Sequence, residues 1–236
     1  MSEAAEAGEH GFARKALLCL IPVLIGGGAL IDQFCAPWGQ PVVSCVIWLS
    51  YLSLLSLETP QHRVALVACL IIATLGEVVL SLVWGLYDYR LHNIPLFVPP
   101  GHVLLFWFGL QTVRHVPARL LDSILPVSGL VSIVLAIAQL DALSVFLWAM
   151  FLACWKWGRA RRFYAWMFFI ALVMEVFATR IGNWRWQEVV PWVGLPALNP
   201  PLAAGAFYCV LDVLVLAVSA SVPARRFARI LGLAPR

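Results

Sequence analysis

Charged residues are scarce in this sequence. Only 12% of its 236 residues are Asp, Glu, Lys or Arg, whereas 62% are hydrophobic. A soluble domain usually carries about a quarter charged residues, so the composition excludes a soluble globular protein. We place eight apolar segments at 16–35, 41–57, 64–84, 97–114, 120–138, 142–157, 163–180 and 202–222. The sequence therefore predicts an all-α polytopic membrane protein with about eight transmembrane helices, although 97–114 and 142–157 are short for a span of about 20 residues.

The sequence also lacks the residue patterns that hold metals and common cofactors. Its five histidines show no His-x2-His or His-x3-His spacing, which argues against a di-iron membrane desaturase or hydroxylase. Its six cysteines form no Cys-x-x-Cys pair, so we interpret them as small apolar residues. A Walker A loop, a dinucleotide fingerprint and a Gly-x-Ser-x-Gly elbow are absent as well. We therefore predict no metal and no cofactor.

One motif is present twice. The first copy consists of Glu77, Gly85, Tyr87 and Tyr89, followed by Pro95 and Pro99-Pro100, and the second of Glu175, Gly182, Trp184 and Trp186, followed by Pro196 and Pro200-Pro201. Each copy belongs to four predicted spans, an even number, so the copies should have the same orientation. We predict two parallel four-helix repeats, 14–118 and 119–222, related by a pseudo-axis along the membrane normal. A disordered cytoplasmic tail (1–13) and a basic cytoplasmic tail (223–236) flank them.

Three carboxyl groups lie inside apolar segments. Burial favours the neutral form of Glu77 and Glu175, and a neutral carboxyl can act as a general acid. A carboxyl within a membrane usually marks a functional site. The alternative is that they join helices by hydrogen bonds. Ser81 and Thr179 follow the two glutamates by one helical turn, where a hydroxyl can bind the carboxyl or the helix backbone. Asp212 is the third carboxyl, with either a site role or a structural hydrogen bond.

Other candidates surround the repeated glutamates. The aromatic pairs Tyr87/Tyr89 and Trp184/Trp186 either belong to an interfacial belt or form a wall for a flat apolar molecule or a developing cation. Each proline doublet should begin the last helix of its repeat, with Asn199 as a cap of the second. His102 is either a structural donor or a catalyst.

The basic residues favour one side of the membrane. All of the 16 except Arg90, Arg180 and Arg185 fall on the side of the two termini. The positive-inside rule then places both termini in the cytoplasm of a bacterial-type inner membrane. The basic tail fits anionic lipid headgroups better than nucleic acid, so we expect membrane lipids and no nucleic acid as partners.

The two motif copies resemble the membrane carotenoid hydratases of the bisanhydrobacterioruberin and gamma-carotene hydratase type and their carotenoid biosynthesis relatives. The resemblance rests on Glu77, Gly85-Leu86-Tyr87-Asp88-Tyr89 and Ile94-Pro95, and on Glu175, Trp184-Arg185-Trp186 and Gly194-Leu195-Pro196-Ala197-Leu198-Asn199. It implies a cofactor-free lyase that adds water to a C=C bond of a long isoprenoid. One glutamate would protonate the alkene, the aromatic side chains would stabilise the cation, and the other glutamate or Asp212 would steer the water. Apart from the resemblance, in whose pattern Arg90 and His102 have no counterpart, we predict that the substrate site is also lined by Arg90, His102, Asn199, Ser81 and Thr179.

We therefore expect an integral-membrane enzyme that performs acid–base chemistry, either hydration or isomerisation and cyclisation, on an apolar isoprenoid such as a carotenoid. A proton- or cation-coupled carrier of a small solute or lipid is one alternative. A carrier of this kind should have helices that are broken at mid-membrane. In this sequence the Gly and Pro residues that would break helices cluster at one rim of the membrane instead. A non-catalytic lipid-binding protein is the other alternative.

Overall fold

The structure is a computed structural model, which describes residues 3–221. It contains α1 (Glu3–Phe34), α2 (Gly39–Leu57), α3 (Pro60–Glu77), α4 (Val98–Thr112), α5 (Ala118–Ile137), α6 (Leu143–Trp157), α7 (Arg161–Ile181) and α8 (Ala206–Ser221). Shorter elements are the π-helix η1 (Val78–Val83), the 3-10 helix η2 (Val113–His115) and the strands β1 (Tyr87–Tyr89) and β2 (Trp184–Trp186). Each predicted apolar segment overlaps one of the eight α-helices, which confirms the all-α prediction.

Five of these helical segments are long and apolar enough to cross a membrane. They are Phe12–Phe34 of α1, α2, α3 with η1, α5 and α7, while α6 and α8 are apolar but shorter. Large apolar side chains such as Leu75, Leu130 and Ile137 are exposed on the outside of the bundle. An apolar surface of this kind suits lipid rather than water, so the fold indicates a membrane-embedded protein.

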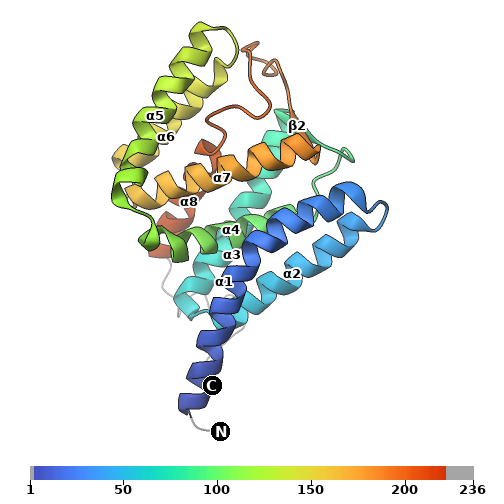
Figure 1. Cartoon of the computed structure of the whole chain (residues 1–236), viewed down its shortest axis with the longest axis vertical. Coiled ribbons are helices and arrows are strands. Elements are labelled where there is room, and N and C mark those ends of the chain that lie inside the picture. Colours follow the sequence, from blue (N-terminus) through green and yellow to red (C-terminus); the bar gives the residue numbers. More distant parts are fainter. Residues whose placement is uncertain (1–2, 222–236) are drawn as a thin grey trace.

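Four helices form the centre of the molecule. α3 packs against α4 and α8, and α7 packs against the same two helices, which closes a ring. The hairpin of α1 and α2 covers this ring on the side of α4 and α7, and the hairpin of α5 and α6 lies against α7 and α8 (Figure 1). α4 is mostly buried, from Val98 to Gly109, and so it carries its side chains into the interior of the ring.

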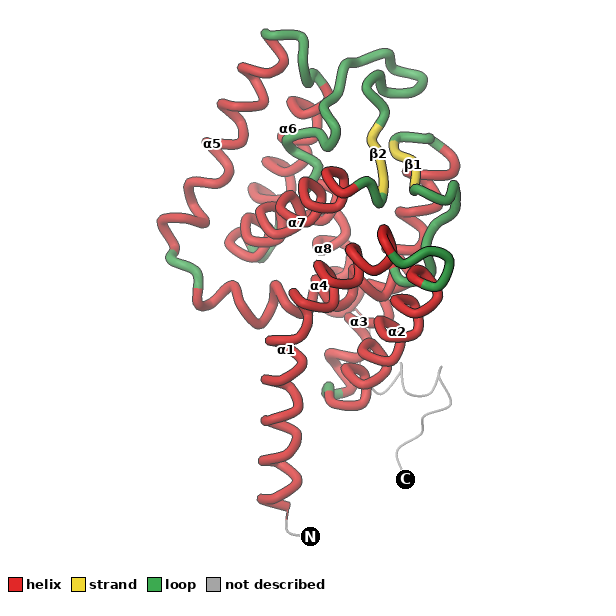
Figure 2. The backbone as a smooth tube through the Cα atoms, turned by 45° about the vertical axis from the view of Figure 1, so that its right-hand side comes forward, coloured by secondary structure: helices red, strands yellow, loops and turns green. Residues whose placement is uncertain are grey.

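The two strands form a small antiparallel ribbon at the end of the bundle opposite the start of α1 (Figure 2). Tyr87 pairs with Trp186, Asp88 with Arg185 and Tyr89 with Trp184. Glycines release the chain from the preceding helices, because Gly85 and Gly182 have φ of 70° and 89°, a conformation that favours glycine. The ribbon therefore joins the segments that follow α3 and α7.

Three expectations about boundaries differ from the structure. α1 begins at Glu3, within the segment 1–13 expected to be a disordered tail, where Ala and Glu are strong helix formers. Pro99-Pro100 lies in the first turn of α4 as predicted, but α8 begins at Ala206 rather than after Pro200-Pro201. The basic tail expected at 223–236 lies outside the described residues.

The delayed start of α8 has a tertiary cause. The backbone N–H of Leu202 donates to Asp141 Oδ2 over 2.8 Å, and the N–H of Ala203 donates to Ser144 Oγ over 3.1 Å. Asp141 lies just before α6, and Ser144 lies in its first turn. The N–H groups that would open a helix after the prolines are thus bound by another helix, and Asp141 and Ser144 hold this segment against it.

Candidate functional site

Glu77 is the last residue of α3, and its carboxyl is turned into the bundle. The phenol groups of Tyr87 and Tyr89 in β1 donate hydrogen bonds to Glu77 Oε2 over 2.9 and 2.8 Å. Burial, and then the neighbouring Glu77 carboxyl, raises the pKa of Tyr87 and of Tyr89 well above its usual value. Both phenols therefore keep the protons that they donate.

Glu175 of α7 is held in the corresponding way by the other strand. The indole N–H groups of Trp184 and Trp186 in β2 donate to Glu175 Oε2 over 2.9 and 3.0 Å. The hydroxyl of Tyr208 in α8 lies 3.5 Å from the second oxygen, Oε1. Each glutamate thus has one oxygen fixed by two aromatic donors from the strand that follows its own helix.

A π-helix compensates for a difference in spacing between the two copies. Tyr87 follows Glu77 by 10 residues, whereas Trp184 follows Glu175 by 9. η1, from Val78 to Val83, lies between Glu77 and Gly85 and has the wider turn of a π-helix. The wider turn accommodates the additional residue, so the aromatic side chains of β1 still reach the carboxyl.

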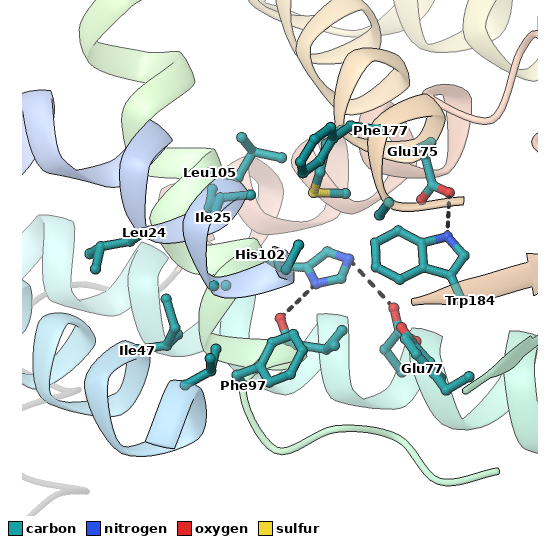
Figure 3. Close-up of a pocket in the computed structure, with 18 of the residues that line it drawn as sticks. Leu24, Ile25, Ile47, Glu77, Phe97, His102, Leu105, Glu175, Phe177 and Trp184 are labelled. Atoms are coloured by element: carbon teal, nitrogen blue, oxygen red, sulfur yellow. Dashed lines mark hydrogen bonds and ion pairs between the residues drawn. The ribbon is translucent and has the colours of Figure 1, made fainter. Parts of the chain in front are cut away.

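His102 connects α4 to this site. Its Nδ1 lies 2.9 Å from the carbonyl oxygen of Val98, and its Nε2 lies 3.5 Å from Glu77 Oε1 (Figure 3). The ring also stacks on Tyr208, with centroids 5.0 Å apart. Because a carbonyl can only accept, Nδ1 carries the proton of that bond, and Nε2 is left to exchange a proton with Glu77.

The two glutamates lie where two apolar spaces meet. The first, here called the inner cavity, measures about 70 Å³ and is lined by side chains of α1, α2, α4 and α7. The second, here called the α3–α8 groove, measures about 510 Å³ and is lined mainly by α3, η1 and α8. Five residues line both spaces: Glu77, Tyr87, His102, Glu175 and Tyr208.

The aromatic residues of the motif face this site. Tyr87, Tyr89 and Trp186 are buried, and Trp184 is partly buried. Side chains in an interfacial belt would instead contact lipid headgroups. Of the two interpretations left open by the sequence, the structure favours the wall around a site.

Other sequence-predicted residues have contacts outside the shared centre. Thr179 Oγ1 donates to the backbone oxygen of Glu175, not to its carboxyl, and Ser81 is buried within η1. Arg90 Nη2 donates to the backbone oxygen and the carboxylate of Asp32, 2.6 and 3.2 Å away, which ties the end of β1 to α1. Ser81, Thr179 and Arg90 line neither the inner cavity nor the α3–α8 groove.

Asp212 lies apart from the two glutamates. Its side chain is fully buried on α8, yet it lines neither the inner cavity nor the groove. Neither carboxyl oxygen has a hydrogen-bond partner among the described residues. The structure therefore does not bring Asp212 together with Glu77 and Glu175.

Asn199 does not cap α8, so that prediction is wrong. Its Oδ1 accepts a hydrogen bond from the backbone N–H of Trp186 over 2.9 Å, and α8 begins only at Ala206. The residue instead fixes β2, and through it the indole that binds Glu175.

Replacement of Asn199 tests this positioning role. Asn199→Ala should lower the free energy of unfolding by about 1–3 kcal/mol, because the N–H of buried Trp186 loses its acceptor. Thermal unfolding in detergent would measure the change. Asn199→Asp keeps an acceptor oxygen and is the matched control; equal destabilisation by both variants would contradict this role.

Sequence reasoning missed Tyr208 and three further buried acids. The contact of Tyr208 with Glu175 depends on how α7 and α8 pack, which no local pattern in the sequence indicates. Asp32, Glu58 and Asp141 stand near the ends of apolar segments, a signal that could have been followed. Each has hydrogen-bond partners, namely Arg90 and Asn183 for Asp32, Arg14, His62 and Trp107 for Glu58, and Ser144 and Leu202 for Asp141.

No protein-family model, curated protein or solved structure matches the chain. Within residues 3–221, His, Cys, Asp and Glu side chains form no group of three suited to a metal ion. What the site contains is carboxyl, imidazole, phenol and indole groups around apolar space.

Proposed function

We propose that this protein is an integral-membrane enzyme that protonates a C=C bond of an apolar isoprenoid, such as a carotenoid, and adds water to it. The observation that carries the proposal is the meeting of Glu77 and Glu175 at the junction of two apolar spaces. Each carboxyl has one oxygen fixed by two donors, so the other oxygen is oriented towards the shared centre. Two oriented carboxyls in an apolar environment suit a reaction that needs one acid and one base.

In the proposed reaction, protonated Glu175 gives its proton to one alkene carbon, and the neighbouring carbon becomes a tertiary cation. A water oxygen bonds to that cation and loses one proton to Glu77. The product is a tertiary alcohol that contains one more water than the substrate. A second water in the shared centre can carry the proton from Glu77 back to Glu175, since both carboxyls line it.

His102 explains why we assign the base role to Glu77. Its Nε2 lies 3.5 Å from Glu77 Oε1 and offers a second place for the proton taken from water. Among the described residues, Glu175 has no such imidazole neighbour; its side-chain partners are Trp184, Trp186 and Tyr208. The acid and the base are thus distinguished by what surrounds them.

The aromatic rings support the cationic step. Tyr87 packs against Trp186 with centroids 4.9 Å apart, and Tyr89 against Trp184 with centroids 5.7 Å apart. An aromatic face attracts a cation by about 0.5–2 kcal/mol, with the higher value where water is excluded. These rings surround the carboxyls and would stabilise the charge that forms after protonation.

The membrane architecture belongs to the same proposal. We infer that all eight helices cross a bacterial-type inner membrane as two four-helix repeats, with both termini in the cytoplasm. The register of the ribbon supports the repeat, because Tyr87 pairs with Trp186 and Tyr89 with Trp184. Since Tyr87 corresponds to Trp184 in sequence, and Tyr89 to Trp186, this is the reciprocal pairing that a two-fold axis produces.

Isotope-labelled water tests the reaction. Purified protein would be incubated with a linear carotenoid in lipid discs, and the products would be analysed by mass spectrometry. Incorporation of heavy oxygen from water is the result expected of a hydratase. Deuterium incorporation without oxygen would indicate isomerisation or cyclisation instead. If neither label enters any of the isoprenoids tested, the non-catalytic lipid-binding alternative is supported.

His102 gives a prediction about the base. His102→Phe keeps an aromatic ring for stacking on Tyr208 but removes Nε2, so the reaction should slow by about tenfold or more. A wild-type rate in His102→Phe would show that the imidazole takes no part in proton transfer.

A further inference from the structure

We infer that the substrate is a single linear chain that reacts near one of its ends. The chain end would enter the inner cavity, the reacting bond would lie between Glu77 and Glu175, and the rest would lie in the α3–α8 groove. This inference rests on the proposed function and adds the shape of the substrate and its direction of entry.

The size of the inner cavity limits what can pass the carboxyls. Its volume of about 70 Å³ is far smaller than the 510 Å³ of the α3–α8 groove. The inner cavity therefore accommodates a much shorter part of a substrate than the groove does. The wall away from the carboxyls is apolar, with Leu24, Ile25 and Ile47 (Figure 3). A short hydrocarbon end matches this space, whereas a polar headgroup would lose its hydrogen bonds.

The α3–α8 groove has the length and lining for the rest of the chain. Apart from Glu77, Glu175 and His102, its lining residues are uncharged, and most are apolar. It extends along α8 from Tyr208 to Val218, a distance of about 15 Å at the rise of an α-helix. Leu75, Val79 and Leu214 on its rim are exposed on the lipid-facing surface. A long chain could therefore enter from the bilayer without leaving an apolar environment.

The two helical hairpins lie differently against the two spaces. α1 contacts α4 and α7, and α2 contacts α4, so this hairpin forms one wall of the inner cavity. The other hairpin contacts α7 and α8 and leaves the line between α3 and α8 uncovered. The two spaces adjoin at the five residues that line both of them. A single chain that occupies both spaces is therefore a better match than two separate lipids.

Two glycines allow each space to be filled separately. A Cβ atom added at Gly101, which lines the inner cavity, or at Gly76, which lines the groove, meets no heavy atom within 4 Å. Gly27 on α1 has the same free space and lines neither of the two spaces. Substitution by Leu at these positions gives two obstructing variants and one matched control.

The experiment compares these variants on a long and a short linear polyene with the same reactive end. Gly101→Leu should lower turnover of both by about tenfold or more, since even one additional methylene in a filled pocket has an effect of that size. Gly76→Leu should raise the KM of the long polyene by a similar factor and leave the short one unchanged. Gly27→Leu should behave as the wild type. Gly101→Ala, which adds a single methyl group, should give an intermediate effect if the Leu variant does not fold.

Binding is measured beside turnover, by quenching of tryptophan fluorescence by the polyene. Equal effects of Gly76→Leu on the long and the short polyene, or wild-type turnover in both Gly101 variants, would overturn the inference. A wild-type protein that binds the long polyene without converting it would contradict the proposed function alone. In that case, weaker binding by Gly101→Leu and Gly76→Leu would still support the threaded chain.

Discussion

Replacing either glutamate of the site by glutamine should slow the reaction by about 10²- to 10⁴-fold, the usual contribution of an oriented acid or base. In Glu175→Gln the amide oxygen can still accept from Trp184 and Trp186, whose N–H groups bind the present carboxyl over 2.9 and 3.0 Å. In Glu77→Gln the same holds for the two tyrosines. The packing is kept and the transferable proton is lost, so the expected effect is on turnover and not on folding.

The measurement is the rate of product formation by each variant in lipid discs, together with its thermal unfolding. Glu188→Gln is the matched control, because Glu188 is an exposed acid that pairs with Arg185 and lines neither the cavity nor the groove. Wild-type rates in both site variants would mean that the carboxyls serve only to hold the strands. A loss in only one of them would show that a single carboxyl performs both proton transfers.

Glu58→Ala should lower the free energy of unfolding by about 3 kcal/mol, the lower end of the range for breaking a buried ion pair. The Glu58 side chain is fully buried and binds Arg14 over 2.9 Å, His62 over 2.7 Å and the indole N–H of Trp107 over 2.8 Å. It thus links α1, the start of α3 and α4. The lower end applies because Arg14 and His62 keep 35% and 59% of their side-chain surface exposed and can be hydrated.

Thermal unfolding in detergent would measure this loss. Glu58→Gln retains an acceptor for Trp107 and most of the packing, so it should cost less than Glu58→Ala. Arg14→Ala should cost less again, because Glu58 then keeps His62 and Trp107. If the three variants unfold at the wild-type temperature, the connection between these helices does not contribute to stability.

The sequence alone was sufficient to predict the helices and to identify the two glutamates as site candidates. Long apolar segments identify buried or spanning helices by length alone, and a Glu in such a segment is costly enough to be noticed. The repeated spacing after Glu77 and Glu175 also pointed to Tyr87, Tyr89, Trp184 and Trp186, which bind the two carboxyls.

The features that the sequence did not predict correctly depend on contacts between distant segments. The start of α8 was misplaced because Asp141 and Ser144, some 60 residues away, bind the backbone after Pro201; the two bonds span 61 and 59 residues. The contact of His102 with Glu77 results from the position of α4 beside that residue. Local sequence propensity does not encode this position. Arg90 resembled a substrate ligand in sequence, yet its contact with Asp32 spans 58 residues. Local patterns specify elements, whereas their partners are decided by packing.

The donors that hold the two glutamates differ in kind, and this difference has a chemical consequence. A phenol oxygen can donate one hydrogen bond and accept others, whereas an indole nitrogen can only donate. The phenol oxygens of Tyr87 and Tyr89, which donate to Glu77, can therefore each also accept a hydrogen bond from a water or a substrate. The indole nitrogens of Trp184 and Trp186, which donate to Glu175, cannot accept one. The two copies of the motif thus differ in their chemistry: the donors that bind Glu77 can also accept a hydrogen bond, and those that bind Glu175 cannot.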